Sequence, residues 1–278
     1  MECKYHIERN TVQETLVIPM YGRMKSSQLY PFLFKDDGAA RLMSRIDYDF
    51  SSLESNSRNA MQRFGFLEVA VRQYNLAWEV RDYLKTHPNA AVVNLGCGLD
   101  DTGRHCDNGT CRIYNIDYPD VIEVRNDLIP PGAREVNIAC DLNDTSWFQA
   151  IDASGGAVFF ASGVFYYFLR SQVQKLVAAM AAAFPGGRLV FDAANRTAVK
   201  LMLKTWVKYA KIKDVGAYFS VEDAQTELSP WTKESKVSSR NFMLGYNDLK
   251  DPSVSGLFRF IARIGDKFMK MRVIRFDF

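Results

Sequence analysis

The stretch Ala90-Ala91-Val92-Val93-Asn94-Leu95-Gly96-Cys97-Gly98 decides the fold of this chain. It is a short apolar run that ends in a Gly-x-Gly turn, and similar runs follow at residues 112–117, 134–138, 157–161 and 188–192. Helical stretches separate these runs, most clearly at residues 171–184. Continuous apolar strands that alternate with helices are typical of a parallel sheet covered on both faces, so the sequence predicts an α/β fold.

The residues before the first run predict a helical cap. Between residues 64 and 84, apolar side chains recur at a spacing typical of a helix with one buried face, namely Phe64, Leu67, Val71, Leu76, Val80 and Leu84. Pro88 follows as a stop signal. We therefore expect residues 1–88 to form a helical N-terminal cap within the same domain as a sheet-containing core at residues 89–278.

The end of the chain has a different pattern. Residues 236–244 and 270–278 read as strands, and between them Leu257, Ile261, Ile264 and Phe268 lie at helical spacing. This strand-helix-strand unit would close the sheet. The full prediction is a mostly parallel seven-stranded sheet with helices on both faces and an insert around residues 200–255 on the substrate side.

Composition indicates an ordinary soluble globular protein. Among 278 residues, 47% are hydrophobic and 24% are charged, and 35 Lys and Arg against 32 Asp and Glu give a net charge of +3. This excludes a disordered, collagen-like or disulfide-rich protein. The purest apolar run, residues 176–184, is shorter than the span of about 20 residues that a bilayer needs. The first ten residues lack the pattern of a secretory signal, so we expect a cytoplasmic protein with no membrane partner.

The five cysteines predict reduced thiols and no metal site. No two of them have Cys-x-x-Cys spacing. Cys106 and Cys111 lie near His105, but their spacing matches no common zinc pattern.

The ends of the predicted strands suggest a ligand site. In an open parallel sheet, ligands bind beyond the carboxyl ends of the strands, where the strand order reverses. Gly96 and Gly98 permit a tight turn there, but Asp101 stands where a dinucleotide fingerprint needs its third glycine. An acid would repel a pyrophosphate and suit a cationic ligand, such as a sulfonium or its amino group.

Three further strand ends suit an adenosine. Asp117 lies 21 residues after Gly96 and can accept both ribose hydroxyls, unless it is only a solvated strand-end carboxylate. Asp141 and Leu142 can bind and cover an adenine, although Asp144 or Thr145 could instead start a helix here. The run from Ser162 to Tyr167 suggests an aromatic wall beside a reaction centre, and core packing explains part of it.

These motifs resemble the leucine carboxyl methyltransferase family, and within it the tetracenomycin-type polyketide-synthesis O-methyltransferases. The resemblance rests on residues 45–50 (RIDYDF), 93–100 (VNLGCGLD), 117–122 (DYPDVI) and 163–167 (GVFYY). It implies a class I methyltransferase (Rossmann-like) fold with S-adenosylmethionine as methyl donor and S-adenosylhomocysteine as product. It also implies that Arg72 holds the donor's methionine carboxylate, and that Arg23 and Lys25 lie in a segment that closes over the donor. The expected donor-binding residues are Arg72, Asn94, Gly96, Cys97, Gly98, Asp101, Asp117, Tyr118, Asp141, Leu142, Ser162 and Gly163.

The chain departs from the family pattern at two places. Ser162 stands where the family has a glutamate, which removes a carboxylate beside the donor. The family's Asp-Thr-Arg becomes Asp100-Asp101-Thr102. We hypothesise that Asp101 partly replaces the missing negative charge.

The acceptor is expected to be a small carboxylic acid. A phenol, with a pKa of about 10, usually needs a base for methylation, whereas a carboxylic acid, with a pKa of about 4, is already ionised. His6, His87 and His105 stand in no recognisable base motif. This favours a methyl ester of a small acidic or polyketide-like compound, with a phenolic ether as the alternative. No catalytic residue is assigned, but Tyr166, Tyr167 and His105 are candidates for the acceptor side.

Other interpretations remain open. From Trp231 onward, 10 Lys and Arg face 5 Asp and Glu, which could steer an acidic substrate or form only a solvated basic face. No motif supports nucleic-acid binding. A nicotinamide dehydrogenase is disfavoured by Asp101 and by Arg170 where a Tyr-x-x-x-Lys dyad needs lysine. A non-catalytic S-adenosylmethionine-binding protein and a methyltransferase for a protein C-terminus remain alternatives, and the oligomeric state is not predicted.

Overall fold

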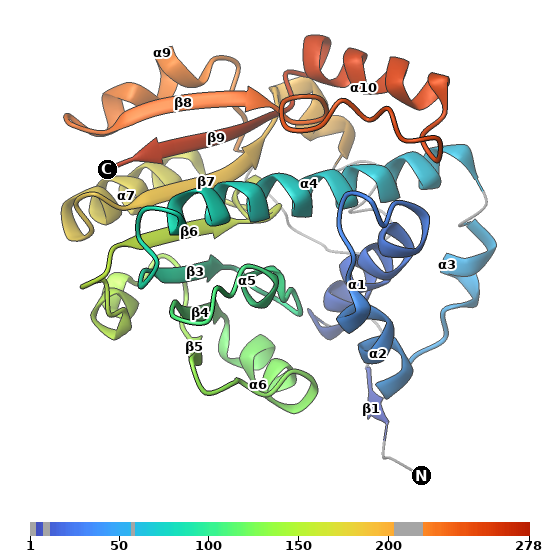
Figure 1. Ribbon diagram of the computed structural model, residues 1–278, viewed down its shortest axis with the longest axis horizontal. Coiled ribbons are helices and arrows are strands. Elements are labelled where there is room, and N and C mark those ends of the chain that lie inside the picture. Colours follow the sequence, from blue (N-terminus) through green and yellow to red (C-terminus); the bar gives the residue numbers. More distant parts are fainter. Residues whose placement is uncertain (1–3, 8–11, 57–58, 203–218) are drawn as a thin grey trace.

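A computed structural model describes residues 1–278 except 1–3, 8–11, 57–58 and 203–218. Its centre is a seven-stranded sheet in the order β5-β4-β3-β6-β7-β9-β8 (Figure 1). The strands are β3 (Ala91–Leu95), β4 (Arg112–Asp117), β5 (Glu135–Ala139), β6 (Ala157–Ala161), β7 (Arg188–Ala193), β8 (Lys236–Asn241) and β9 (Arg272–Asp277). The first five are parallel, and β9 pairs antiparallel with both β7 and β8. The predicted seven-stranded, mostly parallel sheet is confirmed.

The central strands are buried on both faces. Every residue of β3, β6 and β7 is buried, which explains why their sequences are continuous apolar runs rather than alternating ones. The chain builds β3, β4 and β5 outward in one direction and then returns to add β6 on the other side of β3. The strand order therefore reverses between β3 and β6, which is the place where a ligand crevice is expected.

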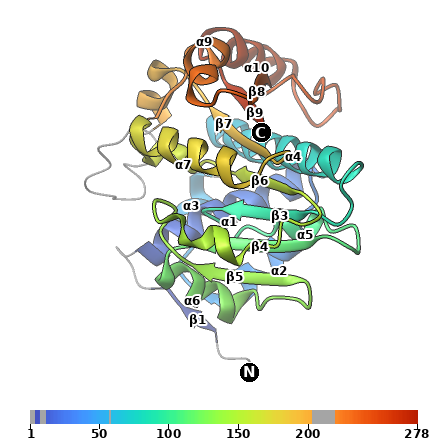
Figure 2. The same cartoon turned by 90° about the vertical axis from the view of Figure 1, so that its left-hand side faces the viewer.

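Helices cover the two faces of this sheet (Figure 2). On one face, α4 (Ala60–Leu84) packs against β6 and β7, and on the other face α7 (Arg170–Ala183) buries Val173, Leu176, Val177 and Met180. Shorter elements complete the layers: α5 (Thr102–His105), α6 (Pro119–Leu128), η1 (Thr145–Ala150), η2 (Phe165–Tyr167), α9 (Ala224–Leu228) and η3 (Ser229–Trp231).

The N-terminal helices lie beyond the carboxyl ends of the parallel strands. They are α1 (Val12–Leu29), α2 (Asp37–Arg45) and α3 (Ser51–Asn56), with a small parallel pair, β1 (Tyr5–His6) and β2 (Ile46–Asp47), beside them. The helix α4 joins the two regions, because its C-terminal half lies over the sheet and its N-terminal half extends past the strand ends (Figure 1). The described part of residues 1–88 is thus largely helical, but α4 is also a layer of the core.

One helical face was predicted wrongly. The helix α10 (Gly256–Phe268) exists, but its buried residues are Phe258, Ala262 and Asp266, while Leu257 and Phe268 are exposed. The buried face of α10 contains Asp266, because this side chain accepts hydrogen bonds from the main-chain N–H groups of Met243 and Leu244. A burial pattern set by a buried carboxylate cannot be read from apolar spacing.

The predicted insert around residues 200–255 falls partly on residues 203–218, which lie outside the described residues. The described remainder contains β8, so much of this segment belongs to the sheet itself. No helix in the described part of the chain is long and apolar enough to cross a membrane. The cytoplasmic location stays a prediction.

Candidate functional site

The glycine turn after β3 is shaped by close packing at the strand-order reversal. Gly96 and Gly98 have φ angles of +64° and +47°, which side-chain-bearing residues rarely adopt. A Cβ on Gly96 would lie 2.7 Å from Cγ2 of Val164, in the segment after β6. Glycine is therefore required at position 96, because the segments that follow β3 and β6 meet there.

Asp117, at the end of β4, holds this turn. Its Oδ2 accepts a hydrogen bond from the N–H of Gly98 at 2.7 Å, and its Oδ1 accepts one from the N–H of Tyr118 at 2.8 Å. Burial raises the pKa of the Asp117 carboxyl, and these two hydrogen bonds oppose the rise. Each carboxylate oxygen keeps a second lone pair, so the predicted ribose contact remains possible.

Arg125, on α6, supports the same turn and was missed in the sequence. Its side chain is fully buried, and Nη1 donates to the carbonyl oxygens of Gly98 at 2.9 Å and Asp100 at 2.7 Å. Its Nε donates to Oδ1 of Asn137 at 3.3 Å. The signal was available: Arg125 lies between Val121 and Leu128 on the apolar face of the helix. A charge on an apolar face predicts a buried partner.

A second arrangement joins α4, β7 and the segment after β6. Arg72 Nε donates to Oδ2 of Asp192 at 3.1 Å, and Asp192 Oδ1 accepts from the N–H of Gly163 at 2.7 Å. The Asp192 side chain is only 1% exposed. Burial and this carboxylate raise the pKa of Tyr166, whose hydroxyl is hydrogen-bonded to Asp192. Asp192 was also missed, although it ends a strand in an acid, as Asp117 does.

Asp101 lies in an ionic cluster with the N-terminal helices. Its Oδ1 is 3.3 Å from Nη2 of Arg23, whose Nε donates to Asp36 at 2.9 Å and whose Nη1 donates to the carbonyl of Leu99 at 2.6 Å. Burial raises the pKa of Asp101. At Asp36 burial also acts to raise the pKa, but Arg23 and the hydrogen bond from the N–H of Ala39 together outweigh it, so the pKa of Asp36 is lowered. The ion pairs of Asp101 are thus with Arg23 on α1 and with His105 on α5.

This cluster also includes His105. Ligand atoms of His105, Asp36 and Asp101 lie within 4.8 Å of one another, a separation that a metal ion could bridge. The guanidinium of Arg23 contacts both carboxylates, so a protein cation already balances them. The His105 ring packs on Phe34 at 4.8 Å. His105 therefore belongs with the N-terminal helices rather than with the aromatic segment after β6.

The remaining expected residues divide by burial. Tyr166 is buried and Tyr167 is 47% exposed, so within the aromatic wall Tyr166 is largely core. The Asn94 amide donates to Oδ2 of Asp100 at 3.1 Å, and burial raises the pKa of the Cys97 thiol. Ser162 is half-buried.

After β5, the structure confirms the helix start at Asp144, whereas the adenine contact of Asp141 and Leu142 stays a prediction. Asp141 is exposed with Leu142 buried beside it, and Asp144 starts η1 by accepting from the N–H of Ser146 at 2.9 Å. Lys25, expected near the donor, pairs with Glu54 at 2.9 Å.

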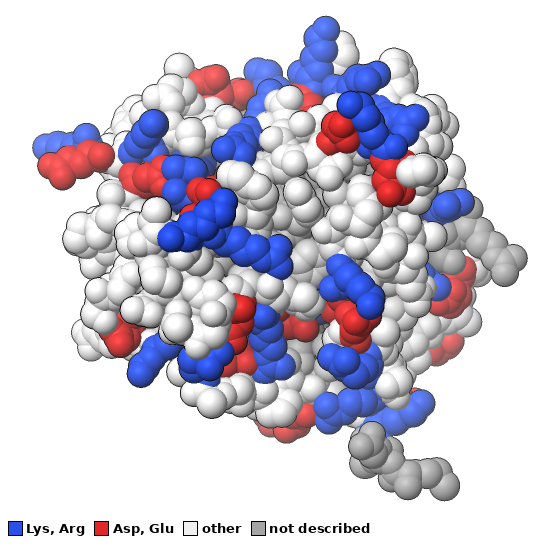
Figure 3. All heavy atoms as spheres, in the orientation of Figure 1, with Lys and Arg blue, Asp and Glu red and all other residues white. Residues whose placement is uncertain are grey.

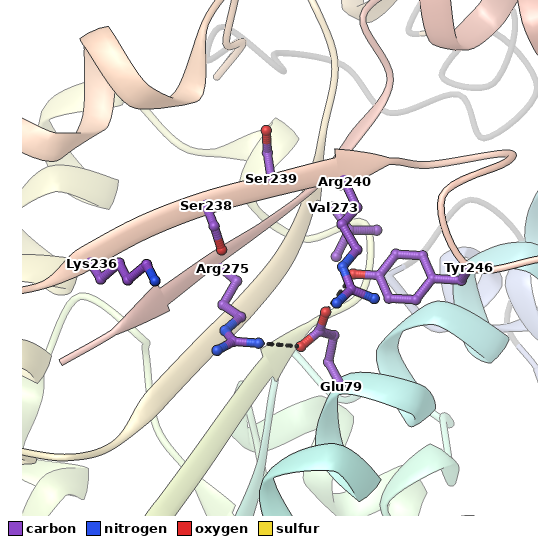
Figure 4. A pocket seen from close by; sticks show the side chains of 8 residues that line it. All are labelled: Glu79, Lys236, Ser238, Ser239, Arg240, Tyr246, Val273 and Arg275. Atoms are coloured by element: carbon purple, nitrogen blue, oxygen red, sulfur yellow. Dashed lines mark hydrogen bonds and ion pairs between the residues drawn. The ribbon is translucent and has the colours of Figure 1, made fainter.

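A hollow of about 260 Å³ lies elsewhere, against the outer strands β8 and β9 (Figure 4). The Tyr246 hydroxyl donates to Glu79 at 2.6 Å, Arg275 approaches Glu79 at 3.5 Å, and Arg240 lies 4.5 Å from the Trp78 ring. Basic and acidic side chains interleave over this face of the molecule (Figure 3). This favours the interpretation of the basic C-terminal section as a solvated face.

The sheet order and the covering helices define a class I methyltransferase architecture, in which the strand order reverses between β3 and β6. The sequence model of the leucine carboxyl methyltransferase family matches residues 17–181, more than half of the 278 residues. The chain belongs to this family.

Individual relatives agree with this assignment. The chain is 26% identical to the tetracenomycin polyketide synthesis O-methyltransferase TcmP of Streptomyces glaucescens, over 87% of this chain and 84% of that protein. Its fold resembles a DUF574 family protein from Streptomyces avermitilis, with a TM-score of 0.58 and 11% identity over 91% and 96% of the two chains. It also resembles the plantazolicin methyltransferase BamL, solved in complex with a triazolic desmethylPZN analogue and S-adenosylhomocysteine (TM-score 0.51, 12% identity, 96% and 98% coverage). These likenesses confirm the predicted fold and family.

Proposed function

We propose that this protein is an S-adenosylmethionine-dependent O-methyltransferase that converts the carboxylate of a small acidic or polyketide-like compound into a methyl ester. The observation that carries the proposal is the Arg72–Asp192–Gly163 arrangement beside the glycine turn. Family membership and the similarity to TcmP support the same reaction class.

The residues present fit the donor. Among the described residues, Arg72 uses only Nε for its hydrogen bond and ion pair, to Asp192. Its two Nη groups are left to hold a carboxylate in a bidentate manner. Asp117 would accept the ribose hydroxyls, Asp141 and Leu142 would hold the adenine, and the turn from Gly96 to Gly98 would offer its main chain.

The protein's contribution is position and exclusion of water. When bound, the donor supplies a methyl group already activated on a sulfonium, so the protein needs to align the acceptor rather than create a nucleophile. Helix α1 supports exclusion of water, because Leu16 lies 3.4 Å from the position of a Cβ on Gly98.

Asp192 also bears on the departure at Ser162. The family glutamate is absent there, but the main-chain N–H of the next residue, Gly163, meets the buried carboxylate of Asp192. A negative charge therefore persists beside Arg72. This supports a functional donor site over the non-catalytic alternative, and it assigns to Asp192 the role first hypothesised for Asp101.

Calorimetric titration with S-adenosylmethionine and S-adenosylhomocysteine, with NAD as control, tests the donor site. We expect micromolar dissociation constants for both sulfur compounds and no detectable binding of NAD. Carboxylic acids would then be screened with the methyl donor, and products would be treated with mild alkali, which cleaves a methyl ester but not a phenolic ether. An alkali-resistant product would replace the carboxylate proposal with the phenolic one. Absence of binding by either sulfur compound would refute both the proposed activity and the S-adenosylmethionine-binding alternative.

A further inference from the structure

Glu68 lies one helical turn before Arg72 on α4. Residues four apart share a helix face, so the two side chains project in the same direction. Arg72 contacts Asp192 at the carboxyl end of β7, and α4 continues past the strand ends toward its N-terminus (Figure 1). Glu68 therefore stands about 6 Å further along the helix axis than Arg72, toward the N-terminal helices.

The Glu68 carboxyl is shielded from water without a direct bond to the described residues. It is half-buried, and within the described residues no hydrogen bond or ion pair to it is recorded. Burial raises its pKa to about 7, and Arg72 opposes the rise only in part. Near neutral pH, the neutral and ionised forms are therefore both populated.

The charged and titratable groups around Glu68 come from three other elements. Tyr166 and Tyr167 lie on η2, and Asp192 lies on β7 with Arg72 against it. On α1, which packs along α4, Arg23 and Lys25 are engaged with Asp36 and Glu54. Arg72 is the one cation in this set that acts on Glu68, and it is partly neutralised by Asp192.

We propose that Glu68, in its protonated form, donates a hydrogen bond to the acceptor's carboxylate and so aims the other carboxylate oxygen at the donor methyl group. This rests on the proposed function. An ionised Glu68 would repel an anionic acceptor, whereas a neutral carboxyl makes a strong charge-assisted hydrogen bond with it.

The reaction balances without a proton transfer. The acceptor oxygen forms a bond to the methyl carbon, the sulfur–methyl bond breaks, and its electron pair stays on sulfur to give a neutral thioether. The acceptor enters as an anion, so no proton is released and Glu68 keeps its own. A base for a phenol would require the opposite, an ionised Glu68 that ends protonated.

The variant Glu68→Gln separates these roles, because an amide donates a hydrogen bond and remains neutral at every pH. Glu123→Gln, an exposed carboxylate on α6, is the matched control. The probes are 2-naphthoate and 2-naphthol, titrated by calorimetry into protein saturated with S-adenosylhomocysteine at pH 6 and pH 8.5. The Glu68 carboxyl is also titrated directly by carbon-13 NMR, with Glu68→Gln identifying its signal.

We expect the wild-type protein and Glu123→Gln to bind 2-naphthoate at least about tenfold more tightly at pH 6 than at pH 8.5, because the raised pKa of Glu68 lies between the two. Proton uptake should accompany binding at the higher pH. Glu68→Gln should bind 2-naphthoate equally at both pH values.

Three results would overturn the proposal. One is an ordinary pKa for Glu68 in the NMR titration. Another is preferential use of 2-naphthol whose turnover Glu68→Gln abolishes, since that identifies a base. The third is no 2-naphthoate binding at either pH by protein that binds S-adenosylhomocysteine, which leaves the donor site intact. Failure to bind S-adenosylhomocysteine would instead refute the proposed function itself.

Discussion

Arg23 and Arg72 both lie against buried aspartates, yet they differ in exposure and in how many of their hydrogen-bond donors are used. Arg23 is 5% exposed and uses Nε, Nη1 and Nη2 to bind three carboxylates and a main-chain carbonyl. The Arg72 side chain is 26% exposed, and toward the residues that the structure describes it donates through Nε alone. A saturated arginine joins parts of the chain to one another, whereas an arginine with free donors can receive a ligand. The number of guanidinium donors already in use therefore separates a structural arginine from one that can bind a ligand.

The largest effect should follow Arg23→Ala. This change leaves Asp36, Asp100 and Asp101 without their shared cation, and uncompensated buried charge costs about 3–5 kcal/mol. We expect that loss in the free energy of unfolding, measured by urea denaturation, with Arg41→Ala on the surface of α2 as control. A loss below about 1 kcal/mol would mean that Arg23 is not the structural partner.

Arg72→Lys should weaken donor binding strongly and change stability little, the opposite of Arg23→Ala. A lysine keeps the charge but not the two-pronged geometry, so we expect S-adenosylhomocysteine to bind about 10- to 100-fold more weakly. The melting temperature should change much less than for Arg23→Ala. Unchanged affinity in calorimetry would remove Arg72 from the donor site.

Glu68→Gln should change stability in a pH-dependent way. The folded pKa of Glu68 is raised to about 7, above its unfolded value of 4.5, so its favourable contribution is complete below the unfolded pKa. That contribution is lost as the pH rises through 7. We expect similar melting temperatures for wild type and variant at pH 4.5, and a variant that melts about 2–4 °C higher at pH 8. Equal melting curves at both pH values would contradict the raised pKa.

The smallest effect on donor binding should come from Asp101→Asn. The recorded side-chain contacts of Asp101 are with Arg23 and His105, so we expect the dissociation constant of S-adenosylhomocysteine to change less than about twofold. A tenfold weakening would restore the hypothesis that Asp101 replaces the missing family charge.

Much of the fold was predictable because the burial of a strand shows in its own sequence as a run of apolar residues. The runs at β3, β6 and β7 are continuous because both sheet faces are covered, and Pro88 stops α4 from extending further. The face of α10 was not predictable, because buried Asp266 serves distant amides.

The site was predictable only where its contacts are near in sequence. The glycine turn and Asp117 have a known spacing, so their proximity was expected. Asp192 meets Arg72 across 120 residues, and no pattern in a single sequence records that contact. Glu68 was missed for a similar reason, since its raised pKa results from tertiary burial.

The continuity of α4 has a consequence for changes in its length. One helix packs against β6 and β7 toward its C-terminus and carries Arg72, at its middle, and Glu68, one turn earlier. Inserting a single residue between Arg72 and the part that packs on the sheet would rotate both groups by about 100° and leave the sheet untouched. The proposed roles of both side chains therefore depend on the helical register of α4, and a change in the length of this helix would disturb them together.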